Sequence, residues 1–99
     1  MSMKATKDNK GQKRALYRAL ASLHDEREAK LFLEDLCTPA ELEAMADRWA
    51  VIEPLKEGIP YRKIHEITGV SVTTITRVAR TLKLGDGGYD LVFARVKEL

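Results

Sequence analysis

The sequence has little cysteine and little proline, and both shortages bear on its structure. One cysteine in 99 residues rules out a disulfide within the chain. This agrees with the reducing cytoplasm, where we expect the protein, and we interpret Cys37 as a small buried hydrophobe. With only three prolines, most of the chain is open to helix formation.

Signatures of membrane insertion and catalysis are also missing. Apolar runs extend for only a few residues, which is too short for a transmembrane span. Residues 1–10 lack the apolar segment of a secretory signal, so we expect none. His24 and His65 form no metal-ligand pattern, and no glycine-rich phosphate loop or nucleophile–base pair is indicated. We therefore expect no metal, no cofactor and no enzymatic activity.

Charge is unevenly distributed although the formal net charge is only +2. Residues 1–24 carry a net +5, residues 25–57 a net −6 and residues 58–84 a net +4. A DNA duplex would attract the two basic segments and repel the acidic one. Charge runs of this kind also occur on ordinary solvated faces, so the pattern alone does not decide the function.

The periodicity of apolar residues predicts an all-α fold. No alternating Val/Ile/Thr run of strand length appears. We predict a flexible basic tail over residues 1–10 and one helical domain over residues 11–99. The expected helices cover about 11–23, 25–36, 39–57, 60–68, 71–84 and 89–99.

Two prolines define the third of these helices. Thr38-Pro39 is a typical helix start, because threonine can cap and proline suits the first helical position. Pro54 lacks a backbone N–H and crowds the carbonyl of Ala50, so we predict a kink or early fraying there. Gly58 is the expected stop.

Residues 60–84 are typical of a helix-turn-helix. Ile64, Val70, Ile75 and Val78 occupy the apolar contact positions of such a unit, and Gly69 falls where the turn needs a positive φ. His65 departs from the pattern, since that position usually holds a small residue. A helix pair that only packs, without binding DNA, remains an alternative.

If the unit binds DNA, side-chain chemistry suggests the roles of its exposed residues. Val72 and Thr73 carry methyl groups suited to thymine, and Thr76 could hydrogen-bond a base edge or a phosphate. Ser71 can cap the recognition helix, whose start is also a site for a phosphate. The predicted DNA-binding residues are Arg62, Lys63, His65, Ser71, Val72, Thr73, Thr76, Arg77, Arg80 and Lys83.

The segment Cys37 to Lys83 resembles the Trp repressor superfamily of bacterial helix-turn-helix proteins. The shared features are Thr38-Pro39, Arg48, Gly58 and the Thr74–Arg77 tract. The tract from Arg77 to Lys83, followed by Gly85 and Gly87-Gly88, is similar to the TrpR-like YerC/YecD branch. The resemblance implies a fold of six helices per subunit in an intertwined homodimer, with recognition helices placed about 34 Å apart for successive major grooves.

The resemblance also implies a candidate ligand pocket at Thr38, Arg48, Thr74 and Arg77. In the Trp repressor two arginines clamp the carboxylate of tryptophan, and Arg48 and Arg77 stand at those positions. Val78 departs from the repressor, which has glycine where the indole lies flat. A valine fills that space, so we expect no tryptophan corepressor.

Three readings of the function stay open at this point. The leading one is a sequence-specific, homodimeric transcriptional regulator that binds double-stranded DNA and acts as a repressor. The second is a sensor of the same fold in which a small carboxylate or amino acid binds near Arg48 and Arg77. The third is a protein-interaction module whose helix-turn-helix docks to another protein, and the acidic surface of residues 25–57 is the feature that most favours it.

Overall fold

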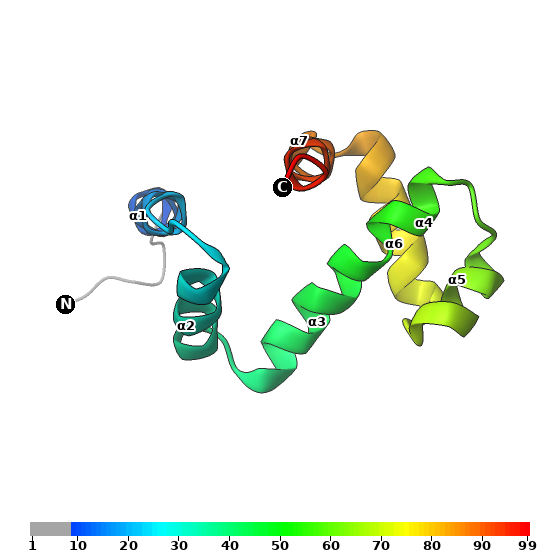
Figure 1. Ribbon diagram of the computed structural model, residues 1–99, viewed down its shortest axis with the longest axis horizontal. Coiled ribbons are helices and arrows are strands. Elements are labelled where there is room, and N and C mark those ends of the chain that lie inside the picture. Colours follow the sequence, from blue (N-terminus) through cyan, green and yellow to red (C-terminus); the bar gives the residue numbers. More distant parts are fainter. Residues whose placement is uncertain (1–8) are drawn as a thin grey trace. The chain divides into compact units, whose positions relative to one another are not determined.

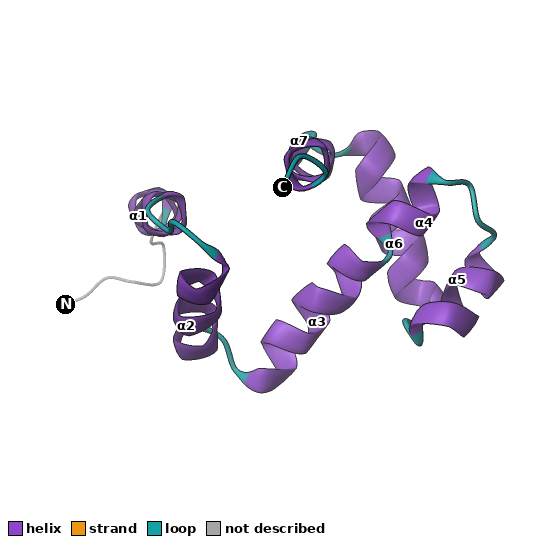
Figure 2. Ribbon diagram, viewed as in Figure 1, coloured by secondary structure: helices purple, strands orange, loops and turns teal. Residues whose placement is uncertain are grey.

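The computed structural model describes residues 9–99, and its regular structure is entirely helical (Figures 1 and 2). Residues 1–8 of the predicted basic tail lie outside the described part. The predicted all-α fold is confirmed, with the third predicted helix divided in two. The helices are α1 (Lys10–Ala21), α2 (Glu26–Leu36), α3 (Pro39–Ala50), α4 (Ile52–Lys56), α5 (Tyr61–Thr68), α6 (Val72–Leu84) and α7 (Gly88–Val96).

Contacts within one copy of the chain group the residues into two compact units. The first ends at Thr38 and contains α1 and α2, and the second runs from Pro39 to Leu99. That residues 11–99 form a single domain therefore stays a prediction. In the part of the chain that the structure describes, no helix is long and apolar enough to cross a membrane.

The first unit has amphipathic helices, and none of its residues from 9 to 38 is buried. Asp25 caps α2, because its side chain accepts a hydrogen bond from the Glu28 N–H at 2.9 Å. The Glu28 carboxylate accepts in turn from the backbone of His24 at 2.8 Å. Several large apolar side chains of this unit are exposed to solvent in one copy of the chain, among them Tyr17 at 61% and Leu31 at 53%.

The second unit contains the hydrophobic core. α6 packs against α3, α4 and α5, and α7 packs against α4 (Figure 1). Leu55, Ile59, Leu82, Tyr89 and Phe93 cover the edges of this core. Its buried centre consists of Val51, Ile52, Ile64, Val70, Ile75 and Val78.

The predicted kink near Pro54 is confirmed as a break between α3 and α4. Val51 adopts φ −95° and ψ 0° and serves as the N-cap of α4. Pro54 then occupies the first turn of the new helix, where backbone N–H groups have no helical partner to lose. Val51 and Ile52 lie at this break and are completely buried. The change of helix direction thus places two apolar side chains in the core.

Gly69 ends α5 with the left-handed conformation that the sequence predicts, at φ 77°. Its N–H donates to the His65 carbonyl at 2.8 Å, which closes the last turn of the helix. A side chain at this position would meet no neighbouring atom within 4 Å, so the constraint is the backbone conformation rather than space.

Replacing Gly69 with alanine should therefore destabilise the protein by about 1 kcal/mol, the usual cost of a left-handed L-residue. Gly88→Ala is a matched control, since Gly88 also has open space but no positive φ. Urea unfolding followed by circular dichroism measures both. Equal unfolding midpoints for the two variants would contradict the role given to Gly69.

Candidate nucleic-acid interface

Helix α6 has one buried and one exposed side. Ile75, Val78 and Ala79 are buried at the spacing of one helical face, and Leu82 continues that face. Thr73, Thr76 and Arg80 lie on the other side of the helix and are exposed. Burial of the apolar stripe thus fixes which side of α6 meets solvent.

The start of α6 is capped by its own sequence. Ser71 has extended backbone, and its hydroxyl oxygen accepts from the Thr74 N–H at 3.1 Å. The Ser71 hydroxyl also lies 3.0 Å from the Thr74 hydroxyl. One of the unpaired N–H groups of the helix start is therefore satisfied, and the others remain at the positive end of the helix dipole.

All of the residues predicted to bind DNA are exposed on α5, on α6 or at the cap between them. Arg62, Lys63 and His65 lie on α5, and the other seven lie at Ser71 or along α6. The helix-turn-helix thus brings the two groups into one unit, because α5 and α6 pack against each other. Their role in DNA binding stays a prediction.

The charge on this surface is mostly positive. Residues 58–84 contain five Lys/Arg and a single acid, Glu66. Lys63 Nζ lies 4.0 Å from the Glu66 carboxylate, and both side chains are well exposed. An exposed pair of this kind interacts weakly, so Lys63 keeps most of its capacity to attract a phosphate.

Three of the four candidate pocket residues, Arg48, Thr74 and Arg77, lie on two helices that pack against each other. Arg48 lies half-buried in the last turn of α3, and α3 packs against α6, which carries Thr74 and Arg77. Thr74 is half-buried, and its backbone and hydroxyl are bonded to Ser71. Thr38 is the last residue of the first unit.

Val78 belongs to the hydrophobic core and is 1% exposed. Its branched side chain packs in the same cluster as Ile75 of α6 and Ile64 of α5. A flat ring at this position would have to displace a close-packed side chain. The expected absence of a tryptophan corepressor stays a prediction.

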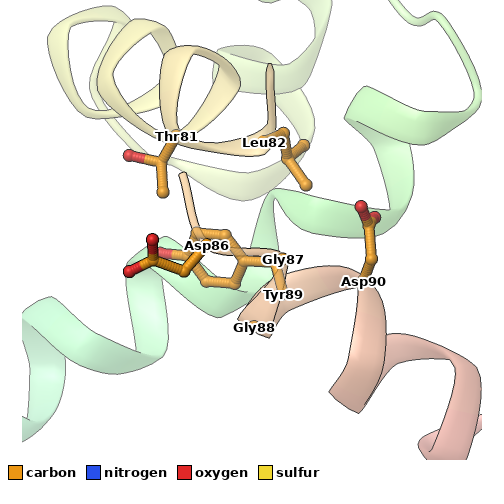
Figure 3. Close-up of a pocket in the computed structure, with 7 residues that line it drawn as sticks. All are labelled: Thr81, Leu82, Asp86, Gly87, Gly88, Tyr89 and Asp90. Atoms are coloured by element: carbon orange, nitrogen blue, oxygen red, sulfur yellow. The ribbon is translucent and has the colours of Figure 1, made fainter. Parts of the chain in front are cut away.

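A small cavity at the C-terminal end of α6 has neither the size nor the residues to bind a ligand or a metal ion. It measures about 20 Å³, which is room for no more than a water molecule, and is lined by Thr81, Leu82 and residues 86–90 (Figure 3). The close-up shows Asp86 and Asp90 on either side of Tyr89. Asp90 is paired with Lys56 of α4, and no group of three or more possible metal ligands occurs in residues 9–99.

Sequence reasoning missed the hydrogen bonds that organise the turn. The Thr68 hydroxyl donates to the Ile64 carbonyl at 2.7 Å and accepts from the Val70 N–H at 3.1 Å. His65 Nδ1 lies 2.8 Å from the Val70 carbonyl oxygen. A threonine directly before the glycine of a turn was the available signal, because its hydroxyl competes for nearby backbone groups.

The sequence and the fold of this chain are similar to those of other proteins. A family model described as Trp repressor protein matches residues 12–97, and the chain therefore belongs to the Trp repressor family. The uncharacterized protein YerC of Bacillus subtilis (strain 168) is 42% identical over 83 residues, which are 84% of this chain and 80% of YerC. The predicted resemblance to the YerC branch is thus confirmed.

Two solved structures share the fold. A TrpR-like protein from Eubacterium eligens ATCC 27750 is 42% identical, with a TM-score of 0.82 over 92% of this chain and 95% of that chain. A candidate Trp repressor from Staphylococcus aureus is 29% identical, with a TM-score of 0.83 over 98% and 95% of the two chains. The Trp-repressor-like fold is therefore established by both sequence and structure.

The capping contact at the start of α6 leads to a first test of the site. Ser71→Ala should lower the unfolding free energy by about 1 kcal/mol, because an N–H of the helix start loses its acceptor. Ser71→Asp should restore that stability, since a carboxylate also caps and suits the helix dipole. Denaturant unfolding compares the three proteins, and an alanine variant as stable as the aspartate variant would contradict the assigned cap.

Proposed function

We propose that this protein is a sequence-specific DNA-binding regulator of transcription, a repressor by mode of action, which inserts α6 into the major groove. The observation that supports this most directly is the two-sided character of α6. Its apolar side is held in the core, and the opposite side presents Thr73, Thr76 and Arg80 to solvent. Membership of the Trp repressor family supports the same function.

Two kinds of contact to DNA follow from the residues at this surface. Val72 and Thr73 at the start of α6 suit contact with thymine methyl groups, and Thr76 one turn further can reach a base edge or phosphate. The cationic side chains, His65 and the capped helix start suit phosphates, which position the protein without reading sequence. Among Val72, Thr73, Thr76 and Arg77, only Arg77 has a guanidinium that can form two hydrogen bonds to one base. Much of the sequence specificity would therefore come from methyl contacts, water and DNA shape.

A homodimer completes this proposal. α1, α2, α3 and α7 contain no buried residue in one copy of the chain. Leu91 is 53% exposed and Val96 45% exposed on α7, and apolar side chains of this kind form a face that a partner subunit can cover. A second copy would cover these faces and give two recognition helices related by a twofold axis.

We further propose that the regulator needs no tryptophan corepressor and acts in the cytoplasm, where its DNA lies. Val78 supports the first point, since its side chain occupies the core at the position where the Trp repressor has glycine. Arg48 and Arg77 would then serve an ion pair and a phosphate contact respectively, rather than a carboxylate clamp.

Salt dependence of binding tests the proposed function. The logarithm of the affinity for duplex DNA should fall linearly with the logarithm of salt concentration, by about 0.9 for each phosphate neutralised. Arg80→Ala should reduce that slope by about 1 and weaken binding to all sequences, whereas Arg27→Ala, in the acidic segment, should leave it unchanged. Fluorescence anisotropy measures the slopes, and a nearly flat slope for the unmodified protein would exclude DNA binding.

Calorimetry tests the absence of a corepressor. Titration of tryptophan into the unmodified protein should give no binding heat, because accepting the ring would require removing a buried valine from the core. The Val78→Gly variant removes that side chain and is the informative comparison, with its fold verified by circular dichroism. Saturable binding of tryptophan to the unmodified protein would show that the pocket is intact and that the proposal is wrong.

A further inference from the structure

Val70, in the turn between α5 and α6, is held through its backbone by two side chains of α5. Its N–H donates to the Thr68 hydroxyl at 3.1 Å, and its carbonyl oxygen lies 2.8 Å from His65 Nδ1. The Val70 side chain is 3% exposed and packs in the core. Val70 is therefore fixed on three sides, and we call the contacts of Thr68 and His65 with its backbone the Val70 clamp.

The His65 contact determines which ring nitrogen carries hydrogen. A carbonyl oxygen only accepts hydrogen bonds, so Nδ1 must be the donor. Neutral His65 is therefore the Nδ1–H tautomer, and Nε2 is left as the nitrogen that an outside group can reach. A small residue is usual at position 65 of such a unit. The larger His65 is tolerated because its side chain is exposed and hydrogen-bonds the backbone of the turn instead of packing between the helices.

The position of Val70 matters because α6 begins almost directly after it. Ser71 follows Val70 and caps the helix, so a displaced Val70 would displace the cap and the first turn of α6. Val72 and Thr73, the predicted base-reading residues, lie in that first turn. A contact that holds the Val70 carbonyl thus also holds the direction in which α6 leaves the turn.

We propose that His65 is a positioning residue of the helix-turn-helix, which acts through its Nδ1–H···O=C bond to Val70 rather than chiefly as a phosphate ligand. The proposed effect on DNA affinity rests on the DNA-binding function proposed above. The contact itself does not, because the tautomer of His65 and the stability of the turn are properties of the protein alone.

Two substitutions separate the roles of the ring nitrogens. Asparagine places an amide N–H at the reach of Nδ1, whereas glutamine places one at the reach of Nε2. His65→Asn should retain more DNA affinity than His65→Gln and His65→Ala, each of which should lose about fivefold, as expected for one net hydrogen bond. His24→Asn, at the other histidine, is exposed and should change nothing.

The stability of the same proteins gives a readout that needs no DNA. The unfolding midpoint should be highest for the unmodified protein and His65→Asn, and lower for His65→Gln and His65→Ala. Thr68→Val removes the other half of the Val70 clamp and should resemble the glutamine variant. Circular dichroism first verifies that each variant is helical.

The tautomer is read directly by nitrogen NMR of the unmodified protein, which requires no variant to fold. The proposal predicts hydrogen on Nδ1 and not on Nε2 when the ring is neutral. The Nε2–H tautomer would overturn it, as would a glutamine variant that keeps affinity while the asparagine variant loses it. If the unmodified protein fails to bind DNA, the proposed function falls, and the tautomer and stability order still decide the role of His65.

Discussion

Burial of one side of α6 is the constraint on which the rest of the structure depends. Ile75, Val78 and Ala79 enter the core that Val51 and Ile52 complete from the break between α3 and α4. That packing fixes the rotation of α6 about its own axis, so the polar and basic residues on its other side must face solvent. Gly69 and the Val70 clamp then set where the helix begins.

The same core is small for a chain of 99 residues, and this has a consequence for assembly. Seven hydrophobic residues among residues 9–99 are buried, although 44% of the chain is hydrophobic. Trp49 illustrates the imbalance, because its ring lies 6.4 Å from Tyr89 and 6.5 Å from Phe93 yet stays 37% exposed. The core of one chain supports the helix-turn-helix, and in the homodimer proposed above a second copy would supply the missing burial for the remaining helices.

Much of this fold is predictable from sequence because its strongest signals are local. Thr38-Pro39 marks the start of α3, and Gly69 marks the end of α5, through backbone chemistry that needs no partner. The division of α3 from α4 followed from Pro54, but the burial of Val51 and Ile52 at that break depends on tertiary packing. The Val70 clamp was not predicted, since a histidine–carbonyl contact across a turn depends on a ring orientation that spacing does not encode. DNA contacts require a partner, so the residues that make them remain predictions.

Selection of binding sites from a pool of random duplexes tests the central claim most directly, namely that two outward-facing α6 helices read DNA together. The account predicts enrichment of an inverted repeat whose half-site centres are about 34 Å apart, one turn of the double helix. An inverted repeat is selected only if each α6 helix contacts specific bases and a twofold axis relates the two helices. Recovery of a single unpaired half-site, or of no common sequence at all, would contradict the account.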